Sequence, residues 1–205
     1  MTLPVVHLLS DRTLVPDLAA HAELALAGLP PGTVAIHLRE KDLGGRALLR
    51  AARALAAVCH ARGQLMIVND RLDVALAAGA DGVHLPSDGI PPADARRLLP
   101  GGALVGVSCH SAEDVVRARD GGASHAFLSP IFDTPSKRAY GPPIGIEALR
   151  AATRLGLPLV ALGGVTAERA PELFAAGARG VAAIRAWLSA PDPAAAVRAL
   201  LAGAS

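Results

Sequence analysis

The chain has 205 residues, of which 52% are hydrophobic and 19% charged, and its 20 basic and 18 acidic side chains give a formal net charge of +2. The arginines are scattered along the sequence, and three Phe, one Tyr and one Trp provide few rings for stacking on bases, which argues against a nucleic-acid partner. Glycine, proline or charge interrupts every apolar run before the ~20 residues that a membrane-spanning helix needs, so we expect no membrane span.

The first residues, MTLPVVHLLSDR, lack the basic start and long apolar stretch of a secretory signal, which predicts a cytoplasmic protein. Cys59 and Cys109 have neither metal-ligand nor disulfide spacing, and we expect both to be buried thiols. A chain of this length needs only one core, so we expect a single domain over residues 1–205.

Short apolar or β-branched runs alternate along the whole chain with Ala/Leu/Arg-rich segments of helical spacing. The sequence predicts strands at 5–10, 33–39, 65–69, 82–85, 103–108, 125–129, 157–162 and 180–184. It predicts helices at 15–28, 45–62, 71–79, 92–99, 111–121, 145–155, 167–177 and 193–203, several of which end at a glycine.

Eight alternating units favour an α/β fold, a (β/α)8 TIM barrel, over an open doubly wound sheet. The open sheet usually has a glycine-rich first turn, whereas the first turn here reads LLSDRTLVP. Runs such as LVGV, LVAL and VVHLL suit parallel strands that are buried on both faces. Polar residues gather just after the strands, where barrel enzymes hold their active sites.

Three charged residues, Arg39, Glu40 and Lys41, close the second predicted strand. Together with Lys137 from another loop, the two cations would form a clamp for an anionic group at the barrel mouth. The alternative is a solvated loop of alternating charge.

Asn69 and Asp70 close the third predicted strand, and Asp88 follows the fourth. Asp70 is a candidate Mg²⁺ ligand, because Mg²⁺ sites often combine one or two carboxylates with substrate phosphates, and Asp88 is a candidate second carboxylate. The alternative for Asn69 is a side-chain cap on the helix that follows; both roles are compatible.

The segment LGGVTAE places Gly163 and Gly164 after the seventh strand and before an expected helix start. Backbone N–H groups and the helix dipole would favour a phosphate there, whereas the alternative is a tight turn that needs positive φ. Ile184 and Arg185 end the eighth predicted strand and would line the same pocket.

The longest predicted loop covers residues 129–143 and is expected to act as a lid whose Thr134, Ser136 and Lys137 donate hydrogen bonds to an anion. Its prolines are equally compatible with a rigid structural loop. His37, His84 and His110 fall at strand ends, and each is a candidate acid or base or a structural histidine.

Five segments, taken together and in order, resemble the superfamily of thiamine phosphate synthase and the TenI thiazole tautomerase. They are HLREK, VNDRLDVALAAGADGVHL, GVSCHS, SPIFDTPSK and LVALGGVTAERAPELFAAGARGVA. The resemblance runs from about residue 5 to residue 188 and implies a TIM barrel that acts on small phosphorylated pyrimidine and thiazole substrates. It leaves open whether the chain forms a homo-oligomer.

For the synthase, the resemblance implies a Mg²⁺-bound pyrophosphate that leaves a hydroxymethylpyrimidine, followed by attack from the nitrogen of a thiazole phosphate. Carried over, the pyrophosphate would be held by Arg39, Lys41, Asn69, Ser108 and Lys137, and the metal by Asp70. The thiazole phosphate would be held by Thr134, Ser136, Gly163, Gly164, Ile184 and Arg185, while His84 would flank the pyrimidine.

Several positions depart from these patterns. The synthase pattern HxGQxD reads HLPSDG here, so Ser87 replaces the glutamine and Gly89 stands at the second metal-binding aspartate. His37 stands where the synthase prefers glutamine. In the tautomerase pattern the catalytic histidine falls at Pro130, and His110 or His37 would have to replace it. The synthase is favoured, and a tautomerase and a non-catalytic phosphate-binding regulatory protein stand as alternatives.

Overall fold

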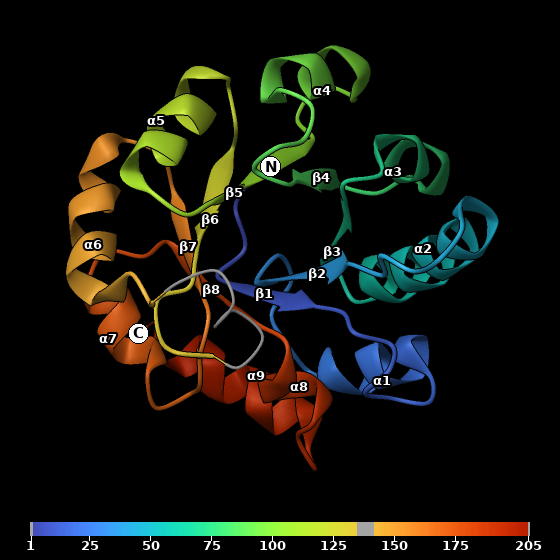
Figure 1. Cartoon of the computed structure of the whole chain (residues 1–205). Helices are drawn as coiled ribbons and strands as arrows, with labels where there is room; N and C mark the ends of the chain where they lie inside the picture. Colours follow the sequence, from blue (N-terminus) through green and yellow to red (C-terminus); the bar gives the residue numbers. More distant parts are fainter. Residues whose placement is uncertain (1, 135–141, 205) are drawn as a thin grey trace.

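Eight parallel strands form a closed barrel in the order β1 to β8, with helices around the outside (Figure 1). This closed parallel topology confirms the expected TIM barrel. The computed structural model describes residues 2–134 and 142–204. The strands are β1 Val6–Leu9, β2 Val34–Leu38, β3 Leu65–Asn69, β4 Gly82–Leu85, β5 Leu104–Cys109, β6 His125–Leu128, β7 Leu159–Leu162 and β8 Gly180–Ala183.

Each expected helix is present, generally shorter at its ends than the sequence pattern predicts. The α-helices are α1 Leu18–Ala25, α2 Gly45–Ala61, α3 Leu72–Ala78, α4 Pro92–Leu98, α5 Ala112–Asp120, α6 Gly145–Ala152, α7 Ala170–Ala175, α8 Arg185–Leu188 and α9 Pro193–Ala202. The sequence pattern missed α8, because four residues make barely one turn and show no helical periodicity.

The buried faces and the starts of the helices follow from the spacing of apolar residues and from local caps. In α2 the buried residues Leu48, Ala52, Leu55 and Cys59 recur every three or four positions, which puts them on the face toward the barrel. Ser111 starts α5 with a capping box.

The side chains of each strand alternate between the helices and the barrel interior. Val6 and Leu8 of β1 pack in the large cluster between strands and helices, whereas Leu9 packs with Phe127 in a separate cluster that fills the interior. Leu3 contacts this cluster and a second interior cluster formed by Ala35, Leu65, Ile67 and Leu104. The segment before β1 therefore covers the amino-terminal end of the barrel, and the opposite end is the mouth.

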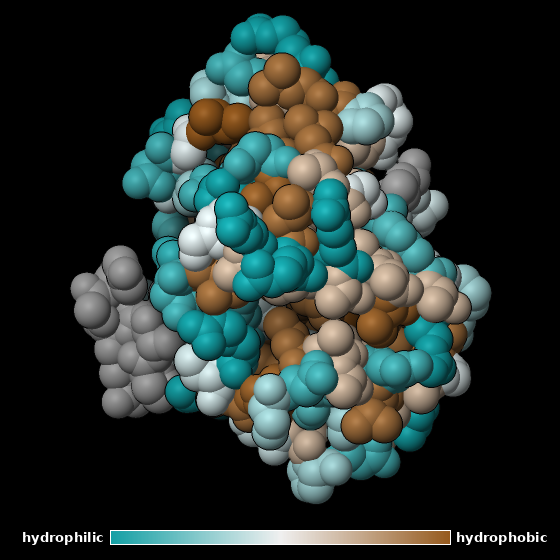
Figure 2. Space-filling view, turned by 90° about the vertical axis from the view of Figure 1, so that its right-hand side faces the viewer, coloured by the Kyte–Doolittle hydropathy of each residue, from teal (hydrophilic) through white to brown (hydrophobic). Residues whose placement is uncertain are grey.

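The outer surface mixes hydrophilic and hydrophobic residues, as the side view shows (Figure 2). Within the described residues, the large hydrophobic side chains that are most exposed lie on or near α1, α3 and α4; they are Leu24, Leu76, Ile90 and Leu98. None of the described helices has both the length and the apolar character that a membrane crossing requires. As expected, Cys59 and Cys109 are buried free thiols.

Candidate active site

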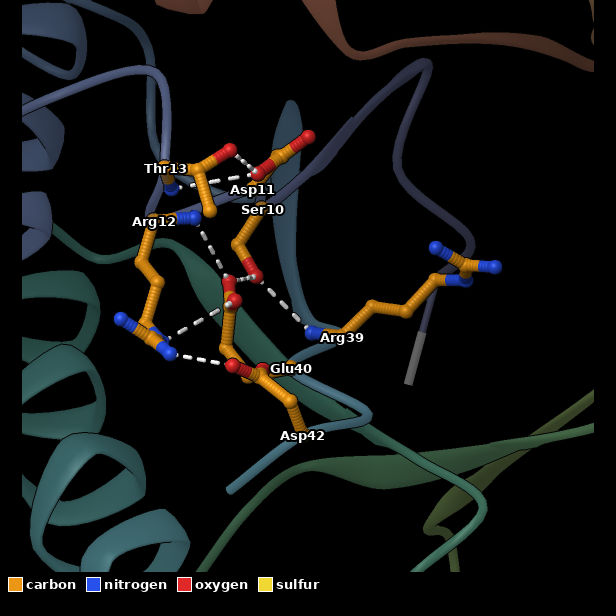
Figure 3. A network of polar contacts seen from close by, with 7 residues as sticks. All are labelled: Ser10, Asp11, Arg12, Thr13, Arg39, Glu40 and Asp42. Atoms are coloured by element: carbon orange, nitrogen blue, oxygen red, sulfur yellow. Dashed lines mark hydrogen bonds and ion pairs between the residues drawn. The ribbon is translucent and has the colours of Figure 1, made fainter. Parts of the chain in front are cut away.

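A polar network joins the loops after β1 and β2 at the barrel mouth (Figure 3). At its centre the Glu40 side chain is 5% exposed, and its Oε1 accepts the Ser10 hydroxyl at 2.5 Å and the Arg12 backbone N–H at 3.1 Å. The Arg12 guanidinium lies 3.9 Å from Oε2 of Glu40 and also pairs with Asp42. The Ser10 hydroxyl in turn accepts the backbone N–H of Arg39 at 2.9 Å.

This network shows that Glu40 does not belong to a solvated loop, so that alternative is wrong for Glu40. It anchors the backbone between the two expected cations: Arg39 is half-buried and its side chain extends away from the network (Figure 3), while Lys41 is exposed. The network therefore fixes Arg39 at the mouth without neutralising its guanidinium. Lys137, the third expected cation, lies outside the described residues.

A turn at the end of β3 holds Asp70 at φ 66°, the one positive φ among the described non-glycine residues. The Asp70 N–H donates to the His84 carbonyl at 2.8 Å, and the Arg71 N–H donates to the Asn69 carbonyl at 2.8 Å. In a non-glycine residue such a conformation raises the conformational free energy by about 1 kcal/mol. Strained positions of this kind cluster at functional sites. Helix α3 starts without a side-chain cap, so the expected cap by Asn69 is absent.

The loop after β4 holds Gly89, which stands at the second metal-binding aspartate of the synthase pattern, in a tight turn. The N–H of Gly89 donates to the Pro86 carbonyl at 3.1 Å, and a Cβ on Gly89 would lie 2.8 Å from Cδ of Pro86. An aspartate at position 89 would therefore force this turn to move. Asp88 and Ser87 are exposed in the same turn.

A magnesium ion would find a partial set of ligands at this mouth. Among the described residues no three His, Cys, Asp or Glu side chains are grouped to hold a metal. Asp70, exposed at the end of β3, fits a site in which one protein carboxylate acts together with substrate phosphate oxygens.

Gly163 and Gly164 follow β7 with φ 102° and 65°, so both adopt backbone conformations that other residues rarely take. A Cβ on Gly163 would lie 2.8 Å from Cα of Pro130, and one on Gly164 would lie 2.7 Å from Cβ of Phe132. The turn therefore packs directly on the start of the β6–α6 loop. The expected helix start beside the glycines is wrong, since residues 167–169 form a turn and α7 begins at residue 170.

Four other expected residues of the thiazole phosphate site lie near the mouth or beyond the described chain. Strand β8 ends at Ala183, so Ile184 caps α8 and the exposed Arg185 is its first residue, a small correction to the expected strand end. Thr134 is half-buried at the edge of the described chain, and Ser136 lies outside it.

Four histidines and Phe127 occupy the barrel interior below the mouth. His7, His37, His84 and His125 are each at most 3% exposed, and the Phe127 ring centroid lies 4.1 to 5.7 Å from all four imidazoles. We call these four residues the histidine layer. His37 and His84 were expected at the site, whereas the sequence patterns missed the other two, although His7 lies between Val6 and Leu8, which face the helices.

The histidine layer is neutral at physiological pH. Burial lowers the pKa of His7 and of His84 to about 3. Burial, together with charge repulsion from neighbouring histidines, holds the pKa of His37 and of His125 well below the ordinary value. Neutral imidazoles act as hydrogen-bonding groups and add no charge to the mouth.

Gly106 of β5 makes room for two of these rings. A Cβ at this position would lie 2.5 Å from Nδ1 of His84 and 2.6 Å from Nε2 of His125. Those nitrogens and Nδ1 of His125 are buried without hydrogen-bond partners within the described residues. The opposite nitrogen of His84 lies 3.0 Å from the Ser108 hydroxyl, so His84 and Ser108 face the mouth as a pair.

His110 lies above Ser108, exposed on the β5–α5 loop. Its Nδ1 lies 2.7 Å from the Ser129 carbonyl, which only accepts, so Nδ1 carries the hydrogen. Of the histidines expected to act as acid or base, His110 has an exposed ring, whereas His37 and His84 are buried and neutral.

A separate cavity of about 300 Å³ lies outside the barrel, between the loops after β1 and β2 and the helices α1 and α2. Arg12 and Glu40 form part of its wall, and most of the remainder is apolar. Arg12 and Glu40 therefore belong both to the network of Figure 3 and to the wall of this cavity.

Comparison with known proteins decides the family. Residues 6–187 match the profile of the thiamine monophosphate synthase family. The chain belongs to this family. It is 48% identical over 181 residues to the thiamine-phosphate synthase of Methanoculleus marisnigri, covering 88% of this chain and 86% of that protein.

Other relatives agree with this family assignment. The thiamine-phosphate synthase of Roseiflexus sp. (strain RS-1) is 41% identical over 197 residues, covering 96% of this chain and 83% of that protein. The solved thiamine phosphate pyrophosphorylase from Pyrococcus furiosus superposes with a TM-score of 0.87 at 30% identity, covering 98% of this chain and 95% of that one. The resemblance read from the five sequence segments is thereby confirmed.

Proposed function

We propose that this member of the thiamine monophosphate synthase family joins hydroxymethylpyrimidine pyrophosphate to thiazole phosphate and releases pyrophosphate. The observation that carries the proposal is the fixed position of Arg39, whose backbone is tied to Ser10 and Glu40 while its guanidinium extends away from them. The relatives named thiamine-phosphate synthase support a transferase of thiamine biosynthesis.

In this reaction the bond between the pyrimidine methylene carbon and the pyrophosphate oxygen breaks, and the ring nitrogen of the thiazole forms a new bond to that carbon. Arg39 and Lys41 would bind the departing pyrophosphate from one side of the mouth, and Asn69 and Ser108 would add polar contacts. Catalysis then rests on charge neutralisation and on positioning of the two substrates. A bound Mg²⁺, held by Asp70 and the pyrophosphate, would supply further neutralisation of negative charge.

The thiazole phosphate would bind on the opposite side, near Gly163, Gly164 and Ile184. The backbone turn at the two glycines offers N–H groups close to the mouth, and Arg185 adds a positive charge beside it. Thr134, Ser136 and Lys137 are proposed to complete this side of the site, and His84 with Ser108 to flank the pyrimidine from below.

A tautomerase is the second candidate, favoured by one observation. His110 is exposed at the mouth and its Nδ1 faces the Ser129 carbonyl, which leaves Nε2 able to exchange a proton with a bound molecule. This histidine could take the place of the catalytic histidine of the tautomerase pattern, where Pro130 stands.

Three measurements on purified protein separate the candidates. The first supplies both substrates, with and without Mg²⁺, and follows thiamine phosphate. The proposal expects product that depends on Mg²⁺. Folded protein that makes no product but interconverts thiazole phosphate carboxylate tautomers would establish the second candidate. Binding of the thiazole phosphate without either reaction would indicate a regulatory protein. A cytoplasmic location and a homo-oligomer also stay predictions.

A further inference from the structure

The tautomers of two residues in the histidine layer follow from their hydrogen bonds. Nε2 of His7 lies 3.1 Å from the Pro4 carbonyl, which only accepts, so this nitrogen carries a hydrogen. Nδ1 of His7 lies 2.8 Å from Nε2 of His37. In a neutral His7 ring, Nδ1 has no hydrogen and accepts, so the hydrogen of this bond belongs to Nε2 of His37.

Neutrality of both rings is supported by their surroundings. Both are fully buried, and burial holds the pKa of each well below physiological pH. A neutral His37 with a hydrogen on Nε2 has a lone pair on Nδ1. The chain of bonds from Pro4 through His7 therefore makes Nδ1 the accepting atom of His37.

The register of β1 and β2 shows on which side of His37 its partner His7 lies. His7 pairs with Ala35, and Leu9 pairs with His37, so along the paired strands His7 lies two residues further from the mouth than His37. Nε2 of His37 is thus bonded to His7 on the side away from the mouth. Because the two ring nitrogens of an imidazole bond in divergent directions, Nδ1 of His37 is directed away from His7.

We propose that His7 is a positioning residue that fixes the tautomer of His37, so that Nδ1 of His37 accepts a hydrogen bond from an N–H group of the substrate. The group expected is an amino substituent on the pyrimidine ring, since a ring oxo group in its place could only accept. This inference rests on the proposed function for the identity of the substrate, but the tautomer itself does not depend on it.

The tautomer can be measured without turnover. Protein labelled with ¹⁵N-histidine, examined at pH 7 by long-range ¹H–¹⁵N correlation, reports for each ring which nitrogen carries the hydrogen. We expect His37 to have a protonated Nε2 and an unprotonated Nδ1. The reverse assignment in the unmodified protein would overturn the inference, whatever its activity.

Two variants of His7 test the positioning role. His7→Phe removes the acceptor, and we expect a mixture of His37 tautomers and a rise of about five- to tenfold in KM for the pyrimidine substrate, with less change in kcat. KM for thiazole phosphate should not change. His7→Asn places an amide oxygen near the position of Nδ1, and we expect it to restore the tautomer and most of the KM.

The preference of each variant for one substrate over another should not change if the substitution only weakens packing. For each variant, kcat/KM for the amino-pyrimidine is divided by kcat/KM for the oxo analogue, so that intrinsic reactivity cancels between variants. We expect this ratio to fall about tenfold in His7→Phe and to recover in His7→Asn. An unchanged ratio in His7→Phe, with the His37 tautomer also unchanged, would overturn the proposal.

His125→Phe is the matched control, because His125 is equally buried, close to His7 and without a hydrogen-bond partner in the described residues. It should leave the His37 tautomer and the substrate ratio as they are. If the unmodified protein forms no thiamine phosphate but shows the expected His37 tautomer, the proposed function fails while the role of His7 in fixing the tautomer stands.

Discussion

The mouth network and the histidine layer are two polar regions in the same barrel, and they are built in opposite ways. In the network, Glu40 accepts hydrogen bonds from Ser10 and Arg12 and lies beside a guanidinium, so its charge is balanced. In the layer below, three ring nitrogens are buried without partners within the described chain, and every ring stays uncharged. Charged side chains therefore lie at the mouth, where solvent and substrates reach them, whereas the polar side chains of the interior are uncharged.

Acidification should destabilise the folded protein through the histidine layer, and this is the largest effect on stability that we expect. The folded rings of His7 and His84 resist protonation down to a pKa of about 3, whereas unfolded histidines titrate near 6.5, so the unfolded state binds more protons below that pH. The free energy of unfolding should therefore fall as the pH drops below about 6.5, by up to about 1.4 kcal/mol per buried histidine at pH 5.5.

Urea unfolding between pH 7.5 and 5 measures this dependence. Four such residues give an upper limit of about 6 kcal/mol at pH 5.5, and His125→Phe should reduce the slope by about a quarter. A stability that is flat over this range would mean that the layer is charged or hydrated in the folded protein.

Asp70→Asn tests the mouth alone. We expect turnover to fall at least about 100-fold, because loss of the carboxylate weakens the metal site that offsets charge on the leaving pyrophosphate. The unfolding midpoint should hardly change, since Asp70 is exposed. Turnover close to normal in this variant would remove Asp70 from the metal site.

Gly106→Ala tests how tightly the histidine layer is packed. The added methyl would meet His84 and His125 at about 2.5 Å, and overpacking of this kind costs roughly 1–3 kcal/mol. Gly101→Ala is the matched control, because a Cβ there meets nothing within 4 Å. Equal stabilities for the two variants in chemical denaturation would show that the rings move aside freely.

Glu40→Gln tests the role of the network, and of the changes considered it should have the smallest effect. A neutral amide still accepts from Ser10 but no longer attracts Arg12, and we expect a rise of about five- to tenfold in KM for the pyrophosphate substrate, equivalent to about 1 kcal/mol. Asp42→Asn, which alters only the exposed pair with Arg12, should change KM less than twofold. If both variants behave alike, the buried position of Glu40 is irrelevant to substrate binding.

The sequence by itself determined the barrel, its strands and the family. Continuous apolar strands, helical spacing between them and polar residues after each strand are local signals, and each is written within a few neighbouring positions. Arg39, Asn69 and Asp70 were identified in the same way, since parallel strands carry their following residues to one end of the barrel, whereas Ser108 was identified through the resemblance to the family. The relatives confirm the family, while the role of each site residue stays a prediction.

Only the tertiary structure decided how these residues are supported. The partners Ser10 and Glu40 lie 30 positions apart, as do His7 and His37, and no local pattern joins them. The sequence shows that Gly89 departs from the synthase pattern, and only the structure shows that a Cβ at this position would meet the Pro86 ring. Strand closure brings such residues together, and burial then fixes which atoms carry charge and which carry hydrogen, because an unpaired charge in the interior costs too much.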